Sequence, residues 1–146
     1  NVHSPEIVKP KGRRKKDVPN KGYVYFAIGS YALKKEDFLT SLGMPPDTFG
    51  ISGLGVNKPR LNWKITTPMT QNLDLFEMTQ DIMHRLMPIK DRLIALKKAH
   101  PDLDYVLELV FWIGNGSTPA LYFANDLLLF FGEIGTRFDC DMYLAG

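Results

Sequence analysis

Three carboxylates are the residues of this chain whose types and spacing best suit chemistry. Asp139 and Asp141 stand two positions apart in a run that alternates with apolar residues, so a strand would place both on one face. Glu108 interrupts an otherwise apolar run and is expected to face the same way. Such oxygens suit a divalent cation, and a pair of them can divide into acid and base. Because carboxylates on an open face more often contact solvent or pair with neighbours such as Lys64 and Arg137, neither a metal site nor catalytic residues are predicted.

The histidines and the single cysteine offer no second candidate. His3, His84 and His100 lack the spacing of a zinc site, with each other or with a cysteine. Cys140 alternates with apolar neighbours, and no base is indicated beside it. It is therefore predicted to pack in the core as a small hydrophobic residue.

A glycine-rich stretch at residues 50–55 partly matches a phosphate-binding loop. It follows a predicted helix and precedes a predicted strand, which reverses the dinucleotide-binding order, and it lacks the Gly-Lys-Ser/Thr of a nucleotide-binding loop. We interpret it as an exposed loop that binds no cofactor, although such a loop can still be a contact surface.

Charge is unevenly distributed along the chain. Residues 1–22 carry seven basic and two acidic side chains, whereas the remaining residues carry eleven basic and fourteen acidic ones. A basic arm of +5 therefore precedes a body of −3. The arm contains several prolines and glycines and few apolar residues, so it cannot build a core. Its cations would bind nucleic-acid phosphates, and the residues predicted for that alternative are Lys11, Arg13, Arg14, Lys15 and Lys16.

Hydrophobic periodicity predicts the elements that position these side chains. The apolar run at 104–113, rich in β-branched and aromatic residues, is typical of a central strand buried on both faces. Residues 72–99 have a helical period that Pro88 interrupts, which predicts two abutting helices. The full prediction comprises strands at 23–29, 61–67, 104–113, 119–124 and 136–144, helices at 34–42, 72–87, 88–99 and 125–133, a long loop at 44–59, and a hairpin turn at 114–117.

The order of these elements predicts an α+β fold. With interleaved helices and one hairpin, we expect a ferredoxin-like βαβαββαβ sandwich, with a mostly antiparallel sheet, helices packed on one face and the other face partly open. The length of 146 residues fits a single domain at 23–146, preceded by the arm at 1–22. The lone cysteine and the lack of a signal peptide or a membrane-length apolar run predict a cytoplasmic protein.

Several short motifs resemble one family. The Leu-Gly-Met-Pro-Pro-Asp of residues 42–47, Pro59 followed by the Trp-Lys-Ile of residues 63–65, and the Asp-Met-Tyr of residues 141–143 are similar to the domain-of-unknown-function 4279 family. The resemblance covers residues 23–144. It implies a small cytosolic bacterial domain, and some members look like immunity proteins of polymorphic toxin systems. It implies no cofactor and no catalytic residues.

Together, these features favour a non-enzymatic protein-binding domain, in the manner of an immunity protein that blocks a basic toxin by occlusion. Aromatic residues among charges have the composition of interface hot spots, and complementary charge speeds association. The alternatives are a nucleic-acid or ribosome-associated protein that uses the arm, and a small-molecule or metal binder. Self-association through the arm or an exposed edge strand is a further option. The predicted contact residues are Glu108, Trp112, Asp139, Asp141 and Tyr143, with Tyr25 and Lys64 beside them.

Overall fold

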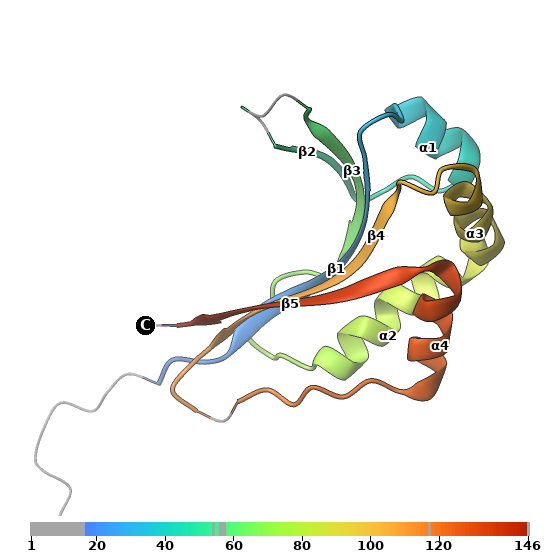
Figure 1. Ribbon diagram of the computed structural model, residues 1–146. Helices are drawn as coiled ribbons and strands as arrows, with labels where there is room; N and C mark the ends of the chain where they lie inside the picture. Colours follow the sequence, from blue (N-terminus) through green and yellow to red (C-terminus); the bar gives the residue numbers. More distant parts are fainter. Residues whose placement is uncertain (1–16, 54, 56–57, 117, 146) are drawn as a thin grey trace, which may run out of the picture.

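The chain is organised around one five-stranded sheet (Figure 1). The computed structural model describes residues 17–53, 55, 58–116 and 118–145. The strands are β1 (Lys21–Ser30), β2 (Thr48–Ser52), β3 (Arg60–Thr66), β4 (Asp104–Ile113) and β5 (Thr136–Leu144). Their order across the sheet is β2-β3-β1-β4-β5. Neighbouring strands are antiparallel except for β4 and β5, which are parallel.

The helices lie on one side of this sheet and leave its other side open (Figure 1). They are α1 (Lys35–Leu42), α2 (Leu75–Leu86), α3 (Lys90–Ala99) and α4 (Asn125–Ile134), with a short 3-10 turn, Met87–Ile89, between α2 and α3. Each helix buries apolar side chains in the core, and removal of that surface from water stabilises the two layers. Within the described part of the chain, no helix has the length and apolarity to cross a membrane.

The helix break predicted at Pro88 is confirmed. α2 ends at Leu86, the proline occupies the 3-10 turn, and α3 begins at Lys90. A proline ring removes one backbone donor and clashes with the carbonyl four residues earlier, so a continuous helix would be costly here.

β4 is buried on both faces, as its apolar run predicts. Leu107 and Leu109 are 0% exposed on the face toward the helices. Val106 and Glu108 on the opposite face are each 4% exposed. β4 lies between β1 and β5, and its observed bounds are those predicted. A carboxyl side chain is therefore held at the floor of the sheet face that the helices leave open.

The loop predicted at 44–59 is partly wrong, because this stretch contains the edge strand β2. Phe49 packs against Phe38 of α1, with ring centroids 6.1 Å apart, and Gly50 pairs with Asn62 of β3. Glycine and proline content argued against regular structure. An edge strand tolerates glycine, however, when its neighbour supplies the backbone hydrogen bonds.

The predicted hairpin is also wrong, because residues 119–124 form no strand. After β4 the chain runs along the lower side of the molecule in Figure 1, and Phe123 packs edge-on against Phe138 at 5.3 Å between ring centroids. It then enters α4 and returns as β5, parallel to β4. The buried side of α4, which includes Leu127 and Phe131, requires the helix to cross the sheet, and such a crossover joins parallel strands.

The α+β class, the mostly antiparallel sheet and the helices on one face are confirmed. The ferredoxin-like topology is not confirmed, because both the strand order and the parallel pair differ from it. The physical reason is local. β2 extends the sheet beyond β3, and α4 places β5 rather than a hairpin partner beside β4.

The chain enters β1 alongside the end of β4. The Val18 backbone N–H donates to Asn115 Oδ1 at 2.9 Å, and the Asn115 N–H donates to the Val18 carbonyl at 3.1 Å. The Gly114 N–H donates to Asn20 Oδ1 at 2.7 Å. Lys21 and Gly22, the last two residues of the predicted arm, already lie within β1. Residues 17–20 are thus held by hydrogen bonds beside the sheet.

Replacement of Gly114 by alanine is expected to lower the free energy of unfolding by about 1–3 kcal/mol. A Cβ atom at this position would lie 1.8 Å from the Val18 carbonyl oxygen, so the backbone must move apart. Gly116→Ala is the matched control, because no atom of the described residues lies within 4 Å of the Cβ that it adds. Urea unfolding of both variants measures the difference. Equal midpoints for the two would contradict the close approach at Gly114.

Candidate functional site

The sheet face turned away from the helices is the candidate site. The sheet curves around this side, and no described helix covers it (Figure 1). Successive residues of a strand point to opposite faces, so every second residue of each strand lies here. We call this surface the open face. Its aromatic and charged side chains include Tyr23, Tyr25, Arg60, Lys64, Glu108, Trp112, Arg137, Asp139, Asp141 and Tyr143.

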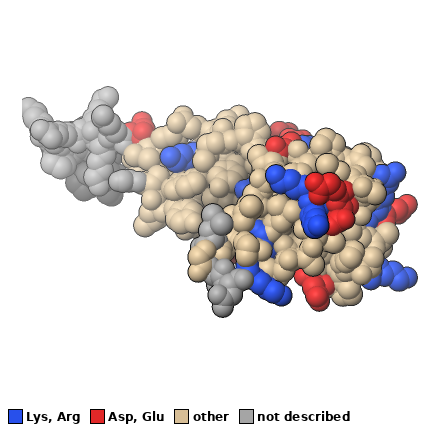
Figure 2. Space-filling model, turned by 90° about the horizontal axis from the view of Figure 1, so that it is seen from above, with Lys and Arg blue, Asp and Glu red and all other residues tan. Residues whose placement is uncertain are grey.

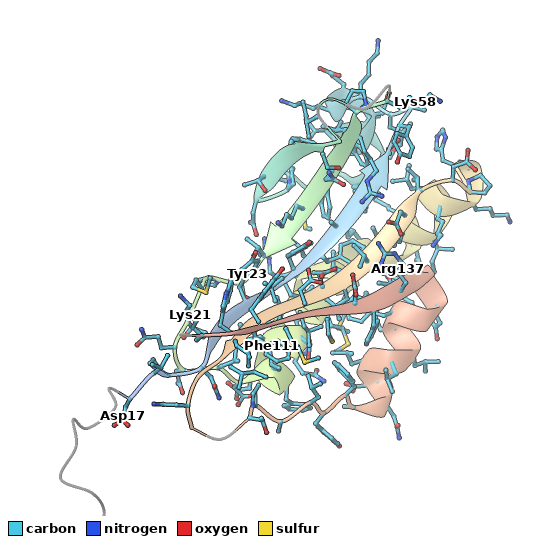
Figure 3. The ribbon with its side chains drawn as sticks, turned by 60° about the vertical axis from the view of Figure 1, so that its left-hand side comes forward. Asp17, Lys21, Tyr23, Lys58, Phe111 and Arg137 are labelled. Atoms are coloured by element: carbon cyan, nitrogen blue, oxygen red, sulfur yellow. The ribbon has the colours of Figure 1, made fainter. Side chains whose placement is uncertain are left out.

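Four rings form a continuous row across three strands of the open face. The ring centroids of Tyr25 and Tyr23 on β1 are 6.1 Å apart, and Tyr23 is 6.4 Å from Trp112 on β4. Trp112 stacks on Tyr143 of β5 at 5.2 Å, because the parallel register sets these two residues opposite each other. Figure 3 shows Tyr23 near the start of β1, far along the sheet from Arg137. This aromatic row lies outside the helix-covered core and forms a rigid apolar contact surface.

Beside the aromatic row, Glu108, Asp139 and Asp141 form a carboxylate cluster. Each offers one oxygen, and these oxygens all lie within 4.8 Å of one another. Glu108 is 4% exposed, and its Oε1 has no hydrogen-bond partner among the described residues. Burial, together with the neighbouring carboxylates of Asp141 and Asp139, raises the pKa of Glu108 to about 8. Near neutral pH the cluster therefore retains a proton.

Cations lie along the whole open face. Lys21 Nζ lies 5.3 Å from the ring centroid of Trp112 at the aromatic end, whereas Arg60 and Arg137 lie at the other end. Arg60 and Arg137 both donate to Asp104, at 3.1 Å and 2.8 Å, and the hydrogen bond from Arg137 is the main reason that the pKa of Asp104 is lowered. Lys64 Nζ lies 3.7 Å from the ring centroid of Tyr25, and burial lowers its pKa. A hollow of about 300 Å³ is lined by side chains that include Arg60, Lys64 and Arg137. The open face thus has an arginine pair at one end, and carboxylates and aromatic rings accompanied by Lys21 and Lys64 along the rest.

All seven predicted contact residues lie on this face, although not at equal depth. Tyr143 is 48% exposed and the Asp139 side chain 47% exposed, so both are accessible to a partner. Glu108 is too deeply buried for direct contact, and its influence on a partner must pass through the two aspartates. Tyr25 and Lys64 are half-buried and already contact each other.

Cys140 and His84 are not part of this face. Cys140 packs against the core, where burial raises the pKa of its thiol, as expected for an unreactive cysteine. His84 is exposed on α2. The five residues of the nucleic-acid alternative, Lys11, Arg13, Arg14, Lys15 and Lys16, lie outside the described residues.

Sequence reasoning missed the roles of Arg60 and Asp104. Extending the alternation of the predicted strands by one residue would have placed Arg60 on the same face as Lys64. Its ion pair was not predictable, because it crosses β1 to reach Asp104 on β4. Gly29 makes this crossing feasible, since a Cβ atom there would lie 2.5 Å from the Arg60 guanidinium.

Charges are mixed on the surface seen from above. In Figure 2, Lys and Arg side chains lie beside Asp and Glu side chains instead of forming one patch of a single sign. A surface of this kind does not create the uniformly positive field that attracts nucleic acid.

A protein-family model with the description "Domain of unknown function (DUF4279)" matches residues 20–145. The match includes every described strand and helix. No curated protein and no solved structure matches the chain significantly.

Proposed function

We propose that this chain, which belongs to the family described as "Domain of unknown function (DUF4279)", is a non-enzymatic protein-binding domain. The observation that supports this most strongly is the aromatic row beside exposed carboxylates, on a sheet face that no described helix covers. The proposed partner is a protein with a basic surface.

The accessible residues suit such a partner in two ways. The stacked rings of Trp112 and Tyr143 supply rigid apolar area, which is the usual content of an interface hot spot. Asp139 and Asp141 accept charge-assisted hydrogen bonds from lysine or arginine. Apolar contact and ionic contact are thus available side by side, and the two together favour binding of a basic surface.

Arg60 and Arg137 would orient the complex. The two arginines share the single carboxylate of Asp104, so a basic surface placed over them meets like charge. The partner would therefore approach over β4 and β5 at the aromatic end. We propose that the domain acts by occlusion, as an immunity protein covers the active surface of a toxin. A nuclease is a suitable case, because its surface is built to receive phosphate.

Charge reversal at Asp139 and Asp141 is expected to weaken partner binding by at least about a hundredfold, because two ionic contacts become repulsive. The tagged full chain would first be used to isolate a stoichiometric protein partner at physiological salt. Titration calorimetry would then compare wild type, Asp139→Lys/Asp141→Lys and Trp112→Ala. The controls are Asp91→Lys and Tyr31→Ala, which alter exposed residues away from the open face. Equal affinity of all five proteins would exclude this face as the binding site.

The basic arm supports a second candidate, binding to nucleic acid or ribosomes. Residues 9–16 carry six positive charges, a density that suits phosphate contacts. This alternative predicts that deletion of residues 1–16 abolishes binding and that affinity falls steeply with salt. Binding through the open face would survive the deletion. Titration of the truncated chain with the protein partner and with nucleic acid therefore separates the two functions.

A further inference from the structure

The carboxylate cluster has the dimensions of an ion site. Glu108 comes from β4, whereas Asp139 and Asp141 come from the adjacent β5. Their oxygens all lie within 4.8 Å of one another. Oxygens bound to one Ca²⁺ lie about 2.3–2.6 Å from it, so two of them are at most about 5 Å apart. The three carboxylates can therefore reach one ion together.

A second observation points to a ligand at this place. Glu108 is 4% exposed, and no donor among the described residues reaches its buried Oε1. The two nearby cations are engaged elsewhere. Lys64 lies over the Tyr25 ring, and Arg137 donates to Asp104 at 2.8 Å and 3.0 Å, while its contact with Asp139 is longer, at 3.8 Å. Among the described residues, Glu108 shares hydrogen bonds with Asp141 and Asp139 of the same cluster, and its buried Oε1 is still left without a partner, which requires an explanation.

We propose that Glu108, Asp139 and Asp141 bind one hard divalent cation of the size of Ca²⁺. The donor set is all oxygen, which excludes a preference for soft metals. A bound ion gives the buried Glu108 oxygen a partner that a docking protein cannot give it, because Asp139 and Asp141 lie nearer the surface. Water would complete the coordination on the exposed side.

The ion site has a structural reason to be precise. Glu108 and Asp139 lie opposite each other in the parallel register of β4 and β5, and Asp141 follows on the same face. Two of the three ligands therefore stand on one rigid strand, and the third stands on its hydrogen-bonded neighbour. Ligands on paired strands are held in place before the ion arrives, which lowers the cost of binding.

The test titrates chelator-treated full-length protein with CaCl₂, MgCl₂ and MnCl₂ at constant ionic strength. We expect one ion per chain by calorimetry and a melting temperature that rises with ion concentration. Luminescence of Tb³⁺, a Ca²⁺ substitute, provides a local readout, because Tyr25 and Trp112 are aromatic neighbours on the same face. Absence of saturable Ca²⁺ binding to the wild type would overturn the proposal.

Two variants locate the ion. Glu108→Gln and Asp141→Asn should each weaken binding by at least about tenfold, because each replaces a carboxylate ligand of the bound ion with a neutral amide. Asp91→Asn on α3 should bind as the wild type does. If Glu108→Gln does not fold, Asp141→Asn decides the outcome, and unchanged affinity in the variant that folds contradicts the site. No protein partner is present in these titrations, so their failure is distinct from failure of the proposed function.

Discussion

The Glu108→Gln variant is expected to gain stability over the wild type as the pH rises. The difference in unfolding free energy between the two proteins should shift in favour of the variant by on the order of 5 kcal/mol from pH 4 to pH 9. Burial and the neighbouring aspartates raise the pKa of this carboxyl from 4.5 to about 8 in the folded protein. The unfolded chain releases the proton near pH 4.5, whereas the folded chain holds it until about pH 8. The free energy of unfolding of the wild type therefore decreases as the pH rises from about 4.5 to about 8. A glutamine has no proton to release, so the variant does not show this decrease.

Urea unfolding at several pH values between 4 and 9, with a chelator present, measures this difference. Glu36→Gln is the matched control, because it makes the same chemical change at an exposed position on α1. The control should follow the wild type across the whole range. Parallel stability curves for wild type and Glu108→Gln would show that the buried carboxyl is not perturbed in the way the cluster geometry implies.

The Phe26→Ala variant is expected to lose about 3–5 kcal/mol of unfolding free energy, because it leaves a cavity at the centre of the core. Phe26 lies on β1, is 0% exposed, and packs against three other rings. Its ring centroid is 5.7 Å from that of Tyr105, 6.2 Å from that of Phe131 and 6.4 Å from that of Trp63. It therefore joins the sheet to α4.

Denaturant unfolding of Phe26→Ala and Phe26→Leu at pH 5 would measure the effect. Leucine fills part of the cavity and should cost less than alanine. Tyr31→Ala removes a ring that is 61% exposed and should stay within about 0.5 kcal/mol of the wild type. A loss below about 1 kcal/mol for Phe26→Ala would mean that the surrounding side chains collapse into the space.

Glu108 links the two proposals for the open face. A bound ion cancels much of the negative charge of the carboxylate cluster, so it should reduce attraction to a basic partner. The aromatic row does not share this dependence. Partner titrations with and without chelator would therefore show how much of the binding free energy comes from ionic contacts of the carboxylate cluster and how much from the aromatic row.

The elements that depend on local signals were determined by the sequence itself. β4 and β5 have the predicted bounds because the apolar run of β4 and the alternating pattern of β5 are contained in the residues of each strand. The break at Pro88 follows from the missing backbone donor of one residue. The presence of Asp139 and Asp141 on one face follows from the strand period of two. None of these features needs a partner from elsewhere in the chain.

The tertiary structure decided everything that depends on which strands are neighbours. β2 forms despite its glycine because β3 supplies backbone partners, and β5 lies beside β4 because α4 must cross the sheet to bury its apolar side. That crossover sets the register that places Glu108 against Asp139. Pairing between distant segments is selected by the burial of whole faces, and no local pattern encodes it. The carboxylates were therefore visible in the sequence, whereas their meeting as one cluster was not.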